Sequence, residues 1–311
     1  MVAEAAREIP AGTIVGDRWR VEAKLGGGGM SLLYAVRHTR TTKRAALKVM
    51  LLEYAESKAM QARFSQEMTV TASLESDHIV KVMDGGADSA LGVLFIVMEL
   101  LQGVDLRAEL LRCGGRLRPA DVAIYLHQAS VGLDLAHADG IVHRDLKPEN
   151  LFLVRRDDGS ACVKVLDFGV AKYIAESLGS AKTTQAIGTP IYMSPEQIRG
   201  DGTIGYAADV YSLAHVAYDL LVGEPYWENE RRKSSSLYGM LMMMAKGPSE
   251  PPSARSIARG VNLPEAFDVW FARATAFDPL SRHASILEAA SELLDLFPEA
   301  LSASTRRIPQ G

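Results

Sequence analysis

A short polar segment carries the side chains with the clearest chemistry in this sequence. It reads His143-Arg144-Asp145-Leu146-Lys147-Pro148-Glu149-Asn150. Asp145 can accept a proton, Lys147 can hold a phosphate as a point charge, and Asn150 can give an oxygen to a metal ion. Further along, the triplet Asp167-Phe168-Gly169 adds a second metal-binding carboxylate. Together these groups are the parts needed to move a phosphoryl group onto a hydroxyl.

Each of these pieces, taken alone, has an ordinary structural explanation. Clusters of Arg, Asp, Lys and Glu usually form solvated faces or turns, and Pro148 suits a turn. An isolated Asp-Phe-Gly triplet carries little information. The complete octapeptide, followed by further motifs in a fixed order, favours the chemical interpretation.

The elements that must position these groups change in type along the chain. Alternating polar and apolar residues before the glycines predict a strand from Arg18 to Leu25. The other predicted strands of a small antiparallel sheet are residues 32–37, 44–50, 79–84 and 94–99. Helices are predicted at residues 57–74, at 119–138 with Asp139-Gly140 as the stop, and within 203–222. Residues 246–264, rich in Pro, Ser and Gly, are predicted to be a long loop. Strands followed by helices indicate an α+β protein with two lobes.

Composition limits the class of protein. The chain has 311 residues, 48% hydrophobic and 23% charged, enough to bury a substantial core. The net charge of −4 gives no electrostatic argument for a nucleic-acid surface, so we expect no nucleic-acid partner. Cys113 and Cys162 lie far apart, which suits a reducing cytosol. No apolar run has the length of a membrane span. The stretch Met240–Met244 is short, and we interpret it as a buried helix face, with a partner-docking surface as the alternative.

The sequence resembles a protein kinase catalytic domain of the bacterial eukaryotic-like (Hanks) serine/threonine type. The resemblance runs from Val15 to Pro298, and the Gly-Gly-Met-Ser form of the first motif is similar to bacterial sensor kinases. The motifs beyond the octapeptide and the Asp-Phe-Gly triplet are Leu25-Gly26-Gly27-Gly28-Gly29-Met30-Ser31-Leu32-Leu33-Tyr34, Ala46-Leu47-Lys48, Glu67, Gly188-Thr189-Pro190, Ser194-Pro195-Glu196, Asp209-Val210-Tyr211-Ser212-Leu213 and Asp278-Pro279 with Arg282.

That resemblance implies a bilobal kinase fold. A small antiparallel-sheet N-lobe with helix C would occupy residues 15–101, and a larger, mainly helical C-lobe residues 102–298. Residues 1–14 would be a leader, and residues 299–311 a linker or tail. We therefore expect a cytoplasmic protein, with the intracellular module of a longer protein as the alternative.

The resemblance also implies catalytic roles. Asp145 would orient the substrate hydroxyl and accept its proton, and Lys147 would neutralise charge on the γ-phosphate. Asn150 and Asp167 would bind Mg²⁺. Thr189 would hydrogen-bond Asp145 and Lys147, which, like the position of Lys147, favours Ser/Thr over Tyr as acceptor.

ATP is the nucleotide that the family uses. Lys48 would pair with its α- and β-phosphates, held in place by an ion pair with Glu67. Glycines let the backbone approach the phosphates, although Ser31 replaces the third glycine of the family pattern and Leu33 replaces its usual valine. The predicted nucleotide-binding residues are Leu25, Gly26, Gly27, Gly28, Gly29, Leu33, Ala46, Lys48, Met98, Glu99, Leu101, Leu151 and Asp167.

Regulation and support are implied as well. Arg144, directly before Asp145, indicates activation by phosphorylation, for which Thr183 and Thr184 are the best acceptors, with Ser177 and Ser180 behind them. Glu196 with Arg282 should form a buried salt bridge, and Asp209 should anchor the catalytic loop. Thr71 stands where the family favours a bulky apolar residue on helix C. We hypothesise that a partner or a homodimer contact through the N-lobe compensates.

Three functions compete at this point. The first is an active serine/threonine kinase acting on protein substrates. The second is a nucleotide-binding pseudokinase scaffold, which loss of Lys48, Asp145, Asn150 or Asp167 would favour, although all are present. The third is a small-molecule phosphotransferase of the same fold, a group that lacks the Gly-Thr-Pro…Ser-Pro-Glu segment found here. The motifs favour the first.

Overall fold

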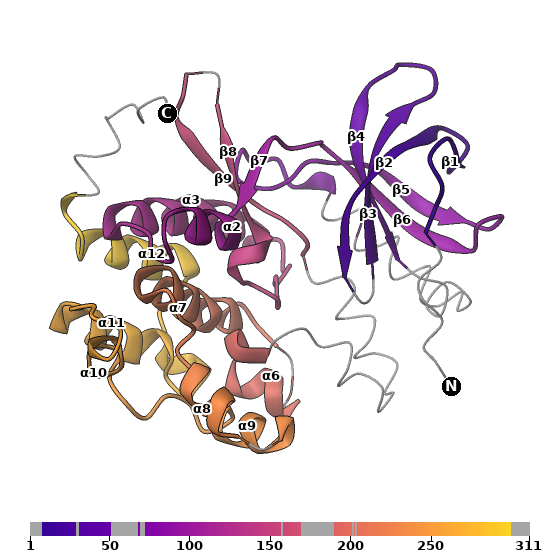
Figure 1. Ribbon diagram of the computed structural model, residues 1–311. Coiled ribbons are helices and arrows are strands. Elements are labelled where there is room, and N and C mark those ends of the chain that lie inside the picture. The colour runs from indigo at the N-terminus through magenta and orange to yellow at the C-terminus, as the bar shows by residue number, and fades with distance from the viewer. Residues whose placement is uncertain are drawn as a thin grey trace. The chain divides into compact units, whose positions relative to one another are not determined.

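The computed structural model describes residues 8–28, 31–50, 68, 72–156, 158–168, 190–200, 202, 204–234 and 236–299 (Figure 1). The chain forms two compact units. The N-terminal unit consists of the described parts of Met1–Glu75 and of Val80–Gln102. The C-terminal unit consists of Ser76–Ile79 and the described parts of Gly103–Gly169 and Thr189–Gly311.

The N-terminal unit is built on one antiparallel sheet with the strand order β1-β2-β3-β4-β6-β5. Its strands are β1 (Ile14–Val15), β2 (Trp19–Gly28), β3 (Ser31–His38), β4 (Arg44–Met50), β5 (Val82–Asp88) and β6 (Val93–Met98). The predicted small antiparallel sheet is therefore confirmed.

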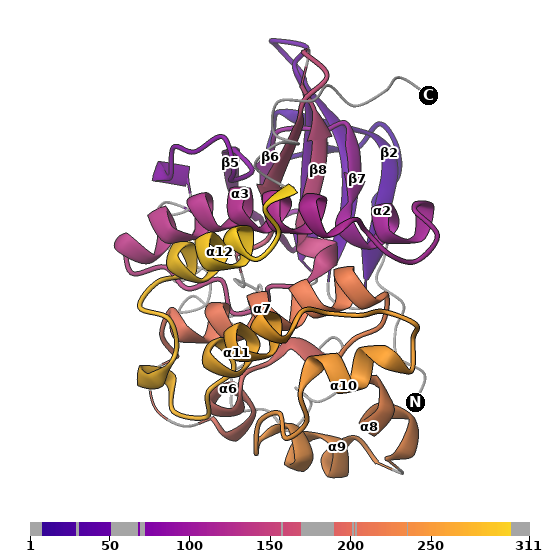
Figure 2. The ribbon, with the colours of Figure 1, turned by 90° about the vertical axis from the view of Figure 1, so that its left-hand side faces the viewer.

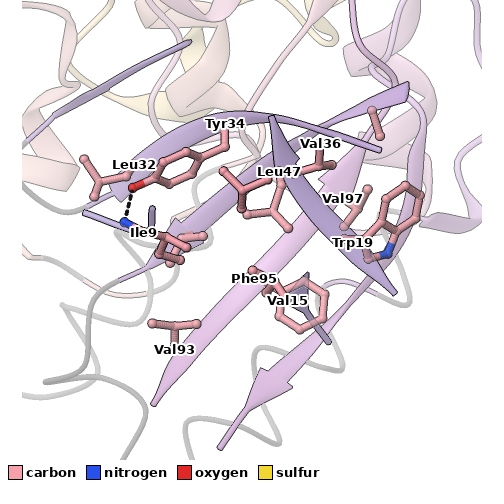
Figure 3. Packing of buried hydrophobic residues seen from close by; sticks show 13 residues of the cluster. Ile9, Val15, Trp19, Leu32, Tyr34, Val36, Leu47, Val93, Phe95 and Val97 are labelled. Carbon is pink, nitrogen blue, oxygen red and sulfur yellow. Dashed lines mark hydrogen bonds between the residues drawn. The ribbon is translucent and has the colours of Figure 1, made fainter. Parts of the chain in front are cut away.

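Alternation along the strands gives this sheet two different faces. One face packs an apolar cluster in which Tyr34, Val36, Leu47 and Val97 are almost completely buried (Figure 3). The hydroxyl of Tyr34 accepts a hydrogen bond from the backbone N–H of Ile9 at 2.9 Å, which ties the segment before β1 to this cluster (Figure 3). The opposite face carries the intervening residues of the same strands.

One strand differs from its predicted position. The sequence predicted a strand at residues 79–84, but β5 runs from Val82 to Asp88. Ile79 instead forms an isolated parallel bridge with Val165 inside the C-terminal unit. The predicted helix at residues 57–74 lies mostly outside the described residues. Within this range, the described residues Met68, Ala72 and Ser73 are helical.

The C-terminal unit is mainly helical, as predicted, and adds a small sheet of order β7-β8-β9. Its strands are β7 (Gly103–Asp105), β8 (Leu151–Arg155) and β9 (Ala161–Val165). Its α-helices are α2 (Leu106–Arg112), α3 (Pro119–Ala138), α6 (Pro195–Arg199), α7 (Ala207–Val222), α8 (Glu228–Lys233), α9 (Leu237–Met244), α10 (Pro252–Ile257), α11 (Glu265–Ala274) and α12 (Ile286–Asp295). Its 3₁₀ turns are η2 (Pro148–Asn150), η3 (Pro190–Tyr192) and η4 (Pro279–Ser281).

Helix α3 confirms its predicted bounds. Pro119 begins it and Asp139 caps it, and Gly140 follows with φ of 76°, a left-handed conformation that favours glycine. Helix α12 packs along α3 (Figure 2). Helix α7 is buried along its whole length, which places its two aspartates, Asp209 and Asp219, inside the protein.

Two predictions about the C-terminal unit need correction. The stretch 246–264 was predicted to be a loop but contains α10, because Pro252 fits the first turn of a helix, where no N–H donor is required. The methionine stretch lies on α9 and is only partly a buried face. Met240 and Met244 are buried, whereas Met242 and Met243 are 47% and 38% exposed. Among the described residues, no helix has the length and apolarity to cross a membrane.

Candidate active site

Three polar side chains of residues 143–150, which we call the catalytic segment after the role that the sequence predicts for it, form one hydrogen-bonded group. Lys147 Nζ lies 2.7 Å from Asp145 Oδ2. Asn150 Nδ2 donates to the Asp145 carbonyl at 2.8 Å and to Asp145 Oδ2 at 3.2 Å. The turn η2 places Asn150 back against Asp145 because Pro148 favours the start of such a turn. The carboxylate of Asp145 is therefore fixed by a cation and an amide.

The orientation of Asn150 fits a metal ligand. Since its Nδ2 is used on Asp145, its Oδ1 points to the other side of the amide, and this oxygen accepts no hydrogen bond from the described residues. The described residues include no cluster of three or more His, Cys, Asp or Glu side chains with metal-site geometry. Mg²⁺ prefers oxygen ligands and usually takes only one or two from the protein, with phosphates and water completing its octahedron, so the Asn150 amide oxygen and the Asp167 carboxylate are of the type that would fit it.

Asp209 of α7 anchors the backbone of the catalytic segment by hydrogen bonds. Its carboxylate accepts hydrogen bonds from the backbone N–H groups of His143 and Arg144, each at 2.8 Å, and contacts His137 Nε2 at 2.8 Å. Burial favours a raised pKa for Asp209, but the bond to His137 and its neighbours' charges together hold the pKa below its usual value. The predicted anchor is confirmed, with His137 as a member that the sequence did not indicate.

Asp167 is tied to the same segment through its neighbour. Leu166, directly before it, donates its N–H to the Asn150 carbonyl at 2.8 Å. The Leu166 carbonyl contacts His143 Nε2 at 2.8 Å, and the ring of Phe168 lies 5.2 Å from that of His143. Asp167 itself has φ of 51°, an uncommon conformation for a residue with a side chain. These contacts hold the end of β9 beside the catalytic segment.

The segment after residue 190 is attached by a buried ion pair. Arg282 contacts both oxygens of Glu196, at 2.7 and 2.8 Å, and the two side chains are 0% and 9% exposed. Burial alone would raise the pKa of Glu196, but hydrogen bonds and charge from Arg282 lower it. The predicted salt bridge is confirmed. Gln197, which closes a capping box with Ser194, also donates to the Arg144 carbonyl at 2.8 Å.

A second polar group borders the catalytic segment and was not predicted. Arg107 of α2 contacts Asp219 at 2.6 Å, Glu149 at 3.1 Å and the hydroxyl of Tyr192 at 2.6 Å. Tyr192 in turn donates to Asp219 at 2.5 Å. No local pattern reveals this group, because its members come from α2, η2, η3 and α7. Gln197, by contrast, was readable from the Ser194-x-x-Gln197 capping box.

The predicted nucleotide-binding residues of the N-terminal unit share one sheet face. Lys48 on β4 is paired with Leu33 on β3, and Ala46 with Met98 on β6. Since directly paired residues point to the same side, these four side chains lie on the face opposite the apolar cluster.

The remaining predicted positions fall into three groups. Leu25, Gly26, Gly27 and Gly28 belong to β2, and Glu99 and Leu101 follow β6. Leu151, the first residue of β8, is fully buried in the C-terminal unit. Gly29, Glu67 and Thr189 lie outside the described residues, as do Thr71, Ser177, Ser180, Thr183 and Thr184.

Asp145, Lys147 and Asn150 thus contact one another within the C-terminal unit, and Asp167 follows the residue whose backbone is bonded to Asn150, while Lys48 lies on the sheet of the N-terminal unit. Convergence of the two groups on one nucleotide remains a prediction.

Comparisons with known proteins agree with this arrangement. The sequence model described as protein kinase domain matches residues 19–297. The chain is 34% identical over 309 residues to the serine/threonine-protein kinase PknL of Mycobacterium bovis, covering 99% of this chain and 73% of PknL. It is 34% identical over 280 residues to PknB of Mycobacterium leprae, covering 89% of this chain and 43% of PknB.

A solved structure shows the same fold. The PknI kinase domain of Mycobacterium tuberculosis superposes with a TM-score of 0.71 at 26% sequence identity, covering 93% of this chain and 100% of that domain. The predicted kinase fold is confirmed by this likeness together with the antiparallel sheet and the helical second unit. This chain therefore belongs to the protein kinase family, as a bacterial Hanks-type catalytic domain and a serine/threonine protein kinase.

Proposed function

We propose that this kinase transfers the γ-phosphoryl group of Mg-ATP to Ser and Thr hydroxyls of proteins. The observation that carries the proposal is the hydrogen-bonded group of Asp145, Lys147 and Asn150, anchored through the backbone to Asp209. It supplies a base, a cation and a metal ligand on one short segment, which is the set that phosphoryl transfer needs.

Asp145 and Lys147 would divide the work at the acceptor. Asp145 would accept a hydrogen bond from the substrate hydroxyl and take its proton as the new P–O bond forms and the bond from the γ-phosphorus to the ADP oxygen breaks, so that ADP leaves. Lys147, 2.7 Å from Asp145 Oδ2, would hold that carboxylate in position and place positive charge where the transferred group becomes negative. Both effects depend on position, because this reaction requires little covalent chemistry from the protein.

Asn150 and Asp167 would hold Mg²⁺. The amide oxygen of Asn150 turns away from Asp145, and the backbone contacts of Leu166 keep the next residue, Asp167, beside it. When bound, the metal neutralises phosphate charge. Lys48 would pair with the α- and β-phosphates and Glu67 with Lys48, while Leu33, Ala46 and Met98 would cover the adenine.

Activation would follow from phosphorylation at Thr183 or Thr184. The phosphate would add charge-assisted contacts to Arg144, whose carbonyl and N–H are already fixed by Gln197 and Asp209. A cytoplasmic location, an N-lobe dimer, the lack of a nucleic-acid partner and the lobe boundaries 15–101 and 102–298 stay predictions.

The test is autophosphorylation with radiolabelled ATP, with and without Mg²⁺, followed by mass mapping. Asp145→Asn should remove the signal while leaving the melting temperature close to that of the parent. Asp134→Asn, a half-buried aspartate on α3, is the matched control and should retain activity. Full activity of Asp145→Asn, or Mg²⁺-independent labelling, would contradict the proposal.

A further inference from the structure

The face of the N-terminal sheet that carries Lys48 also carries a row of arginines at the other end of the same strands. Arg20 on β2 is paired with Arg37 on β3, and Arg37 is paired with Arg44 on β4. Paired residues share a face and lie about 5 Å apart between neighbouring strands. All three are exposed, with 44% of the Arg37 side chain and 53% of the Arg44 side chain open to solvent. We call these residues the arginine row.

The arginine row is not balanced by acidic neighbours. Glu22 is its one carboxylate partner among the described residues, and it is shared by Arg37 at 2.6 Å and Arg44 at 2.9 Å. Arg20 has no ion pair within the described part of the chain, nor do Arg40 and Lys43 in the turn between β3 and β4. Like charges directly opposite each other destabilise a sheet. This concentration of cations is the opposite of the net charge of −4 of the whole chain.

Glu22 shows what the row can bind. The register between β2 and β3 shifts between Val21 and Ala23, so Glu22 sits at a bulge that redirects its side chain. Its two carboxylate oxygens accept hydrogen bonds from the Nε–H groups of Arg37 and Arg44. The guanidinium groups of Arg37 and Arg44 thus converge on one carboxylate, and Arg20, which does not contact Glu22, lies next to Arg37. This arrangement could bind a compact anion of higher charge than a carboxylate.

We propose that the arginine row docks a protein segment that carries phosphoserine or phosphothreonine. Guanidinium groups match phosphate oxygens in a bidentate way, and arginine outnumbers lysine in the row and its adjoining turn. A phosphomonoester carries nearly two negative charges against one on Glu22, so it can displace Glu22 and also engage Arg20. Serine/threonine kinase activity supplies this ligand, because phosphoserine and phosphothreonine are its products.

The site would retain a phosphorylated protein on the kinase after transfer, or recruit one that is already phosphorylated. Extended nucleic acid fits less well, since a polyanion would meet the acidic remainder of the chain. An anionic membrane surface is the main competitor and is separated by the experiment.

Binding is measured by fluorescence anisotropy with the whole chain and no ATP, so the outcome does not depend on turnover or on the proposed catalytic roles. The probe is a labelled peptide with the sequence of residues 178–189, synthesised with phosphate on Thr183. Its only other charged side chain is Lys182, so phosphate must carry the binding. The unphosphorylated peptide and vesicles of phosphatidylglycerol with phosphatidylcholine are the comparison ligands.

Arg20→Gln and Arg44→Gln should each weaken binding of the phosphopeptide by about tenfold, the loss expected for one charge-assisted contact. Glu22→Gln should strengthen it several-fold, because the internal competitor is removed. Lys81→Gln, an exposed cation of the same unit outside the row, should leave binding unchanged. Arg20→Gln should also raise the melting temperature slightly, which a folding defect cannot do.

Three results would overturn the proposal. The first is equal binding of the unphosphorylated peptide. The second is that Arg144→Gln loses binding of the phosphopeptide whereas Arg20→Gln and Arg44→Gln bind it as the parent does, which would place the phosphopeptide at the catalytic segment. The third is Arg20-dependent binding of anionic vesicles without binding of the phosphopeptide, which would assign the row to a membrane.

Discussion

Acidification should destabilise this kinase through one buried histidine. His215 of α7 is 1% exposed, and its ring lies among aromatic rings, with Tyr211 at 4.6 Å and Phe271 at 5.3 Å. Neither ring nitrogen has a hydrogen-bond partner among the described residues. Burial, followed by the positive charges of Arg255 and Arg282, lowers the pKa of His215 from 6.5 to about 3. The folded protein therefore keeps this ring neutral.

The sign and size of the effect follow from the two pKa values. Between pH 6.5 and about 3 the unfolded chain binds one more proton at His215 than the folded chain does. The free energy of unfolding therefore rises with pH in this window and falls on acidification, and above it His215 has no effect. At 1.36 kcal/mol per pKa unit, acidification from about pH 7.5 to about pH 5 should cost roughly 2 kcal/mol through His215 alone.

The assay is urea unfolding at several pH values, for the parent and for His215→Leu. Trp227, 6.2 Å from His215 between ring centroids, reports unfolding of this region by fluorescence. On acidification over the same pH interval, the free energy of unfolding should fall by roughly 2 kcal/mol less in the variant than in the parent, whatever the stability of the variant at neutral pH. Since other groups titrate equally in both proteins, the difference in slope isolates His215. Parallel pH profiles would refute the reasoning.

Three further changes probe the supports of the site. Asp209→Asn should reduce kcat by at least about tenfold with little change in KM for ATP, because an amide cannot accept hydrogen bonds on both sides from His143, Arg144 and His137; an unchanged kcat would contradict the anchor. Glu196→Gln should lower stability by about 3–5 kcal/mol, since Arg282 stays buried without its counter-charge, and adding Arg282→Met should recover part of the loss in a double-mutant cycle. Thr183→Ala combined with Thr184→Ala should lose most autoactivation in a time course of autophosphorylation, and if variant and parent, both first treated with phosphatase, reach equal activity, the assignment is wrong.

Local sequence pattern predicted the elements whose signals are local. Helix α3 has a proline at its first turn and a glycine after its cap, so its bounds were readable. The strands β3 and β4 also lie where they were predicted, at Ser31–His38 and Arg44–Met50. Of the site, Asp145, Lys147 and Asn150 were identified from one octapeptide, because their contacts join residues only a few positions apart.

The remaining features depend on distant partners. A strand was predicted at residues 79–84, but Ile79 pairs with Val165, while β5 includes Gly85 and Gly86, which disfavour strands. Its position is fixed by Asp84, which accepts hydrogen bonds from Arg18 and from Trp19 Nε1 at 2.6 Å. Helix α10 lies in a proline-rich stretch, and its Ser253 is held by Asp268 of α11. The contacts of Arg107 likewise join separate elements, so no local sequence pattern predicts them.

The site itself explains why its supports are polar. Arg144 and Asp167 both have positive φ, at 64° and 51°, although each carries a side chain that disfavours this conformation by about 1–2 kcal/mol. Apolar packing is non-directional and cannot fix a backbone conformation of this kind. Hydrogen bonds can, because they depend on angle as well as distance. Asp209 and Gln197 hold the N–H and the carbonyl of Arg144, and His143 holds the carbonyl that precedes Asp167. The strained backbone on either side of the Asp145 and Asp167 carboxylates is therefore maintained by directional hydrogen bonds, of which the one to the Asp209 carboxylate is charge-assisted, and phosphoryl transfer should depend on these anchors as well as on the groups that touch the substrate.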